Sequence, residues 1–133
     1  METDYKGVMD TIHVWIGFSL KKLEEFEQYF AINSIDRDAG TGASQFDKDI
    51  NINWYDDDLI GVYFNEHSND LEATLDELPV ASETVERQIR SRCAELNIIK
   101  ANALFYYTDS SIVIPYTDKK YNGLTYLGAF DNS

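Results

Sequence analysis

Two hydrophobic periodicities follow one another near the start of the chain. Residues 11–18 alternate between apolar and other side chains, with isoleucine and valine on one side and Trp15 on the other, which is the period of a β-strand. Directly afterwards, apolar residues recur every three or four positions over residues 20–31, and Ser19 could cap a helix there. A chain that changes period within so short a stretch must build its fold from strands and helices together.

The rest of the chain continues this mixture. Further helices are predicted over 45–50, 70–78 and 83–96, and further strands over 59–64, 103–108, 112–117 and 124–130. Residues 33–42, rich in Asp and Gly, are predicted to be a loop. The strands at 103–108 and 112–117 should pair as a hairpin, and Asn122-Gly123 should form another tight turn. These elements predict a single α+β domain over 1–133, with an antiparallel or mixed sheet of four to five strands and helices mainly on one face.

Charge excludes some classes of partner. The chain has 24 acidic and 11 basic residues, a net charge of −13, and residues 36–86 alone hold fourteen acids and two bases. Nucleic acids and anionic membranes need basic contacts, so neither is expected as a partner. The acidic stretch is either a solubilising face or a surface complementary to a basic partner. Residues 1–10 lack the features of a signal peptide, and the lone Cys93 fits a reducing compartment, so we expect a cytoplasmic protein.

Groups for catalysis are sparse. The only histidines are His13, in the first predicted strand, and His67, in a predicted loop. Cys93 falls on the apolar stripe of the helix predicted over 83–96, which is typical of a buried, inert thiol. The sequence has no glycine-rich phosphate loop and no HExxH or GxSxG motif. We therefore expect a non-enzymatic protein with no catalytic residues and no cofactor.

One stretch begins like a calcium-binding loop. Asp47, Asp49 and Asn51 would supply oxygens at positions one, three and five, and Asp58 would stand at position twelve. The sixth position requires glycine for its sharp turn but holds Ile52, and the twelfth usually holds a bidentate Glu. No metal site is therefore predicted. Other pairs of carboxylates are too common in so acidic a chain to indicate a metal-dependent enzyme.

Aromatic and acidic residues alternate in the same region, and this combination suits a protein interface. Trp and Tyr are common interface anchors, and acids beside them can meet a basic cleft. Trp54 could equally be a core residue, because large aromatic side chains dominate core burial. The predicted partner-binding residues are Asp47, Asp49, Trp54, Tyr55, Asp56, Asp57 and Asp58.

Several motifs resemble those of the bacterial immunity protein 22 family, whose members are small cytoplasmic antidotes encoded beside polymorphic toxins. They extend from the first predicted strand to the last and comprise His13-Val14-Trp15-Ile16-Gly17, Glu25-Phe26, Tyr29-Phe30, Ser44-Gln45-Phe46, Asp49-Ile50, Trp54-Tyr55-Asp56-Asp57-Asp58, Ile60-Gly61, Lys100-Ala101-Asn102-Ala103, Tyr121-Asn122-Gly123-Leu124 and Tyr126-Leu127-Gly128. Leu59 stands where the family pattern has bulkier aromatics.

The resemblance implies a protein that binds and neutralises a cognate toxin, in such systems often a nuclease with a basic cleft. Two alternatives stay open on the sequence alone. One is an enzyme that uses clustered carboxylates with a divalent metal, and the other is a regulatory adaptor without a toxin. The oligomeric state is not predicted.

Overall fold

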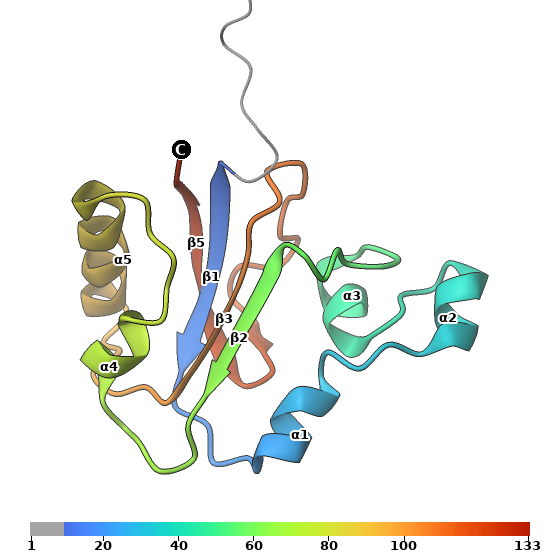
Figure 1. Cartoon of the computed structure of the whole chain (residues 1–133), viewed down its shortest axis with the longest axis horizontal. Helices are drawn as coiled ribbons and strands as arrows, with labels where there is room; N and C mark the ends of the chain where they lie inside the picture. The colour runs from blue at the N-terminus through green and yellow to red at the C-terminus, as the bar shows by residue number, and fades with distance from the viewer. Residues whose placement is uncertain (1–9) are drawn as a thin grey trace, which may run out of the picture.

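The structure, a computed structural model, describes residues 10–133, and its centre is a five-stranded sheet (Figure 1). All strand pairs are antiparallel, and the order across the sheet is β2-β3-β1-β5-β4. The strands are β1 (Thr11–Gly17), β2 (Ile60–Phe64), β3 (Ala103–Tyr107), β4 (Lys120–Tyr121) and β5 (Leu124–Asp131). The helices are α1 (Leu23–Gln28), α2 (Ser34–Ala39), α3 (Gln45–Ile50), α4 (Leu71–Leu75) and α5 (Glu83–Glu95). The predicted α+β class and antiparallel sheet are confirmed.

Strand β1 lies in the middle of the sheet and is buried on both faces. Ile12, Val14 and Ile16 pack on one face, and Trp15 packs on the other. The Trp15 ring stacks on Phe105 of β3 at 4.7 Å between centroids, and the Trp15 indole N–H has no hydrogen-bond partner among the described residues. The strands around Trp15 and Phe105 therefore form the core, as the alternating pattern predicts.

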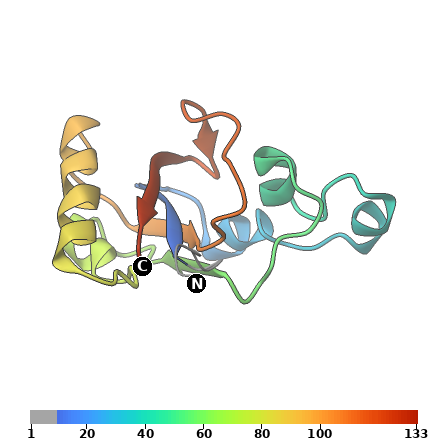
Figure 2. The ribbon, with the colours of Figure 1, turned by 90° about the horizontal axis from the view of Figure 1, so that it is seen from above.

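The helices are divided between the two faces of the sheet, so the expectation that they pack mainly on one face is wrong. Helices α4 and α5 cover the aliphatic face, and α1 and α3 cover the face that bears Trp15, as Figure 2 shows from above. The physical reason lies in the strands: β1 and β3 carry large apolar side chains on both sides, and each side needs a cover.

Helix α1 begins at Leu23, later than the sequence predicts. The Asn102 side chain holds the Ser19 backbone in two hydrogen bonds: it accepts from the Ser19 N–H at 2.8 Å and donates to the Ser19 carbonyl at 2.9 Å. This clamp keeps the chain out of a helix at Ser19, and Lys22 becomes the N-cap instead.

Helix α2 forms within the stretch predicted to be a loop. The Asn33 side chain accepts hydrogen bonds from the N–H groups of Ile35 and Asp36, and Gly40 ends the helix in the left-handed conformation at φ 75°. No residue of α2 is buried. The capping residues therefore set the two ends of α2. The helix lacks the apolar periodicity by which most helices are predicted.

The predicted strand at 112–117 does not form, and the hairpin proposed between it and 103–108 is wrong. Strand β3 already has two neighbours, β1 and β2, so no side is left for a third. The tight turn at Asn122-Gly123 is confirmed, because it joins β4 to β5.

No helix over residues 10–133 is long and apolar enough to cross a membrane. The expectation about a signal peptide falls on residues 1–9, which lie outside the described part, and on Asp10.

Candidate partner-binding surface

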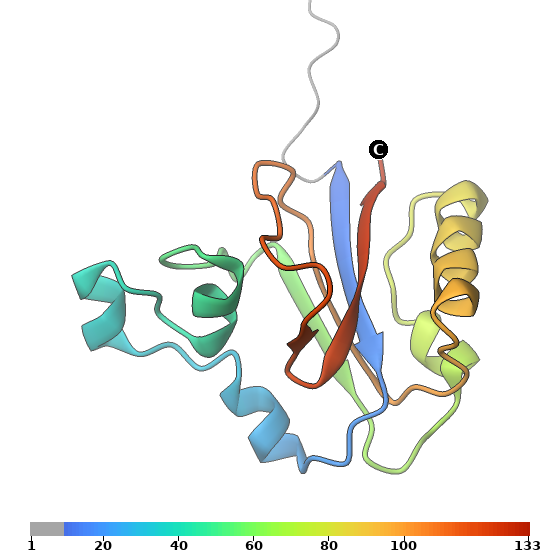
Figure 3. The same cartoon turned by 180° about the vertical axis from the view of Figure 1, so that it is seen from behind.

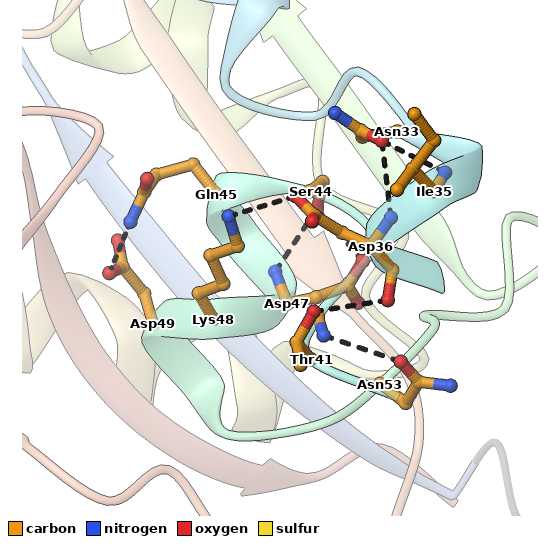
Figure 4. A network of polar contacts seen from close by, with 11 residues as sticks. Asn33, Ile35, Asp36, Thr41, Ser44, Gln45, Asp47, Lys48, Asp49 and Asn53 are labelled. Atoms are coloured by element: carbon orange, nitrogen blue, oxygen red, sulfur yellow. Dashed lines mark hydrogen bonds and ion pairs between the residues drawn. The ribbon is translucent and has the colours of Figure 1, made fainter. Parts of the chain in front are cut away.

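The seven predicted partner-binding residues come from α3 and the loop that leads from it to β2. Figure 4 shows the polar contacts that surround α3. The structure separates the seven residues into two sets. An inner set, Asp47, Asp49 and Tyr55, is engaged inside the protein, and an outer set, Trp54, Asp56, Asp57 and Asp58, is exposed.

Asp47 is fully buried, so its side chain is not available to a partner in this structure, contrary to the expectation that it lies on the contact surface. Its carboxylate accepts hydrogen bonds from the Ser44 hydroxyl at 2.9 Å and from the Tyr55 N–H at 2.7 Å. The Ser44 hydroxyl oxygen also caps α3 by accepting from the Asp47 N–H at 3.1 Å. Burial raises the pKa of the Asp47 carboxyl, and the hydrogen bonds from Ser44 and Tyr55 oppose that rise. Asp47 thus joins the start of α3 to the loop that follows it.

Asp49 is also committed to internal contacts. It accepts hydrogen bonds from the Tyr29 hydroxyl at 2.6 Å, the Gln45 amide at 3.0 Å and the Lys119 ammonium at 3.1 Å, and its side chain is only 15% exposed. Burial, and then the hydrogen bond to Asp49, raise the pKa of Tyr29. These contacts connect α3 with Tyr29, which follows α1, and with the segment before β4.

Tyr55 is half-buried and serves the same structural purpose. Its hydroxyl donates to the Phe30 carbonyl at 2.8 Å, and its ring meets Phe46 edge-on at 5.6 Å between centroids. Burial raises the pKa of the Tyr55 hydroxyl. The inner set therefore fixes the position of α3 and leaves the outer set to face solvent.

Trp54 is 59% exposed, which decides between the two interpretations left open by the sequence: it is not a core residue. The Arg37 guanidinium of α2 lies 4.6 Å from the centre of the Trp54 ring, a cation–π contact. Nothing in the sequence indicated Arg37, because no helix was predicted around it.

Helix α2 reaches Trp54 through polar contacts. The Asn53 carbonyl accepts from the Ala43 N–H at 2.7 Å, and the Asn53 amide donates to the Arg37 carbonyl at 3.2 Å. Lys48 of α3 pairs with Asp36 of α2 at 3.2 Å (Figure 4). Viewed from behind, α2 is the helix farthest from the sheet (Figure 3). The side of the molecule that bears Trp54 is thus supported by hydrogen bonds and ion pairs.

Asp56, Asp57 and Asp58 form an exposed turn just before β2. The Asp56 N–H donates to the Tyr107 hydroxyl of β3 at 2.8 Å, and the Asp56 carboxylate accepts from the Asp58 N–H at 2.9 Å. These two bonds fix the turn. Among the ion pairs of residues 10–133, none involves the carboxylate of Asp57 or Asp58. The turn is a local concentration of negative charge.

One carboxylate oxygen from each of the three aspartates lies within 4.8 Å of the others, close enough to share a cation. Oxygen ligands of this kind suit calcium or magnesium. All three residues are exposed, however, and they belong to one short turn. Among the described residues no fourth His, Cys, Asp or Glu completes the group, and an exposed acidic cluster alone is weak evidence for a metal site.

His13 and Cys93 lie outside this surface, and both are buried. His13 Nε2 is 3.1 Å from the Asp109 carbonyl, which can only accept, so Nε2 carries the proton and Nδ1 accepts from the Tyr126 hydroxyl at 2.9 Å. Burial lowers the pKa of His13 and raises the pKa of Cys93 to about 11. Both groups have the surroundings of structural residues, in agreement with their interpretation from the sequence.

Comparison with known proteins gives one positive result. No curated protein and no solved structure matches the chain. A family model described as Immunity protein 22 matches residues 12–132, which is nearly the whole chain and includes every strand and helix except the first residue of β1, Thr11. The chain therefore belongs to the Immunity protein 22 family.

Proposed function

We propose that this protein is an immunity protein that binds and neutralises a cognate bacterial toxin in the cytoplasm of the cell that makes both. The observation that carries the proposal is the match of the Immunity protein 22 family to residues 12–132. The protein acts by binding to the toxin and neutralising it, and it catalyses no reaction.

The outer set is the proposed contact surface. Trp54 offers an exposed aromatic side chain that a toxin could cover, and the three aspartates beside it offer charge that attracts a basic surface. The inner set supports this surface from below, because Tyr55 holds the loop to Asp47 and to Phe30. A toxin with a basic cleft, such as a nuclease, fits this surface, and nucleic acid does not.

An enzyme that uses clustered carboxylates is the second candidate, and the triplet Asp56–Asp58 is the observation in its favour. Titration with calcium, magnesium and zinc in a calorimeter distinguishes the two. We expect no saturable metal site with a dissociation constant tighter than about micromolar. A metal bound that tightly would measurably stabilise the folded protein. Such a site, if lost in an Asp57→Asn variant, would favour the enzyme.

If a toxin gene lies immediately beside the gene for this protein, the C-terminal domain of that toxin is the one to test. Its association and dissociation rates are measured with wild type, with Trp54→Ala, and with a variant carrying Asp56→Asn, Asp57→Asn and Asp58→Asn. A matched control carries Asp76→Asn, Glu77→Gln and Glu83→Gln, which removes the same charge from exposed residues around α4 and α5.

The two kinds of change should affect different rates. Loss of the three aspartates should slow association at low salt, and the effect should fade at high salt, because the Debye length falls from about 10 Å at 0.1 M to about 3 Å at 1 M. Trp54→Ala should speed dissociation and cost about 2 kcal/mol of binding. If the neighbouring toxin does not bind at all, the function is wrong; if the triple variant binds like its matched control, only the surface is wrong.

A further inference from the structure

Strand β2 is one edge of the sheet, since β3 is its only neighbour in the strand order. Which of its backbone groups face outward follows from the hydrogen bonds at its two ends. The Thr108 N–H donates to the Leu59 carbonyl, and the Asn65 N–H donates to the Asn102 carbonyl, both at 2.9 Å. The register between β2 and β3 is regular from end to end.

In a regular antiparallel pair, alternate residues bond to the partner strand. Leu59 and Asn65 bond to the β3 side, so Gly61 and Tyr63 do so as well, and Ile60, Val62 and Phe64 direct their N–H and C=O groups away from the sheet. No hydrogen bond described within residues 10–133 uses these outward groups. Within the described part of the chain, the edge thus presents three donors and three acceptors that have no partner. In Figure 1 β2 is the strand nearest the viewer, and no other element passes in front of it.

Natural edge strands are usually protected against pairing with another chain by a lysine, a proline, a bulge or a covering element. The β2 sequence, Ile-Gly-Val-Tyr-Phe, contains none of these residues, and its pairing has no bulge. Val62, in its centre, is 43% exposed. The β2 edge is therefore open to an added strand.

Charge indicates which strand could be added. Asp56, Asp57 and Asp58 precede β2, Glu66 follows it, and all four are exposed. Two copies of this chain paired through their β2 edges would bring these like charges together, whichever direction the strands ran. A strand with basic residues near its ends and apolar residues at its centre would meet opposite charges and the Val62 side chain.

We propose that the toxin adds an extended, basic segment to β2, so that its contact with this protein continues from the outer set into the sheet by backbone hydrogen bonds. The inference rests on the proposed function and makes it more specific. The aspartate turn and the strand edge are adjacent in the chain, so one basic segment can reach both.

Amide hydrogen exchange measured by NMR, residue by residue, tests the inference on the unmodified protein. In the free protein the amides of Ile60, Val62 and Phe64 should exchange faster than those of Gly61 and Tyr63. In the complex with the neighbouring toxin domain, the same three amides should slow by about 100-fold, as for amides that enter a stable sheet.

A pair of variants at one position provides a second test. Val62→Pro removes the N–H of residue 62, which points away from β3. The hydrogen bonds between β2 and β3 therefore stay intact, and toxin binding should weaken by about tenfold. Val62→Thr keeps the N–H and the branched shape, and it should bind like wild type. Melting curves of both variants establish that the fold is retained.

The outcomes separate the two proposals. Binding that leaves the three amides unprotected would overturn the added strand while the proposed function stands. Absence of any binding would overturn both. Protection of the same amides in the free protein, growing with concentration alongside a dimer, would show that the occupant is a second copy and would equally overturn the inference.

Discussion

Asp47 and Asp57 belong to the same acidic segment and carry the same carboxylate, but their surroundings are opposite. Asp47 is fully buried and accepts hydrogen bonds from Ser44 and Tyr55, whereas Asp57 is exposed on a turn. The difference shows that acidic density along a sequence does not by itself mark a surface. Some of these carboxylates organise the backbone, and only the remainder are available to a partner.

The largest effect that tests this contrast comes from truncating each of the two aspartates to alanine. Asp47→Ala leaves the Tyr55 N–H and the Ser44 hydroxyl without their acceptor inside the protein, at about 1 to 3 kcal/mol for each buried group. We expect it to lower the free energy of unfolding by about 3 kcal/mol. Asp57→Ala, the matched control, should change it by less than about 0.5 kcal/mol. Urea denaturation measures both, and equal losses would contradict the division into an inner and an outer set.

The pH dependence of stability gives a smaller effect, because the protonated Asp47 can still accept hydrogen bonds. Burial raises the pKa of Asp47 in the folded protein above its ordinary value of 3.8. The folded state then binds this proton more tightly than the unfolded chain does. The stability gained from protonation is fully present below pH 3.8 and is lost as the pH rises through the folded pKa.

Comparison of wild type with Asp47→Asn isolates this contribution. The difference in unfolding free energy, wild type minus variant, should be largest near pH 3 and should shrink as the pH rises toward neutrality. Denaturant titrations at a series of pH values measure it. A difference that grows with pH would mean that hydrogen bonds from Ser44 and Tyr55 outweigh burial at Asp47.

The smallest effect is expected at Trp54, in the outer set. Trp54→Ala should destabilise the fold by about 0.5 to 1 kcal/mol, mainly through loss of the contact with Arg37. A double-mutant cycle with Arg37→Ala should recover a coupling of that size. A loss of about 3 to 5 kcal/mol, as for a core aromatic, would place Trp54 in the interior instead.

Local chemistry explains which parts of the fold the sequence could predict. The bounds of α3 were predicted correctly because Ser44 is a strong cap and Phe46 and Ile50 provide helical spacing. Helix α2 was missed although its caps, Asn33 and Gly40, were visible, because it buries no apolar residue. The false strand at 112–117 has strand-like residues, and only the tertiary fact that β3 already has two partners excludes it.

The candidate site was predictable only in part. The sequence located the loop, and the exposed position of Asp56, Asp57 and Asp58 agrees with their prediction as surface acids. The burial of Asp47 depends on the direction in which the start of α3 faces, which the spacing of Ser44 and Asp47 hints at but does not fix. Arg37 approaches Trp54 from 17 positions away, a contact that no local pattern encodes.

The two tryptophans make this protein its own pair of optical probes. Trp15 is enclosed by aromatic rings, and its indole N–H has no partner among residues 10–133, an apolar setting that shifts fluorescence emission to shorter wavelengths. Trp54, 59% exposed, emits at longer wavelengths and is open to a quencher such as acrylamide. Unfolding can thus be followed through Trp15, and the proposed binding of a toxin at Trp54 can be followed through Trp54, in a single unlabelled sample.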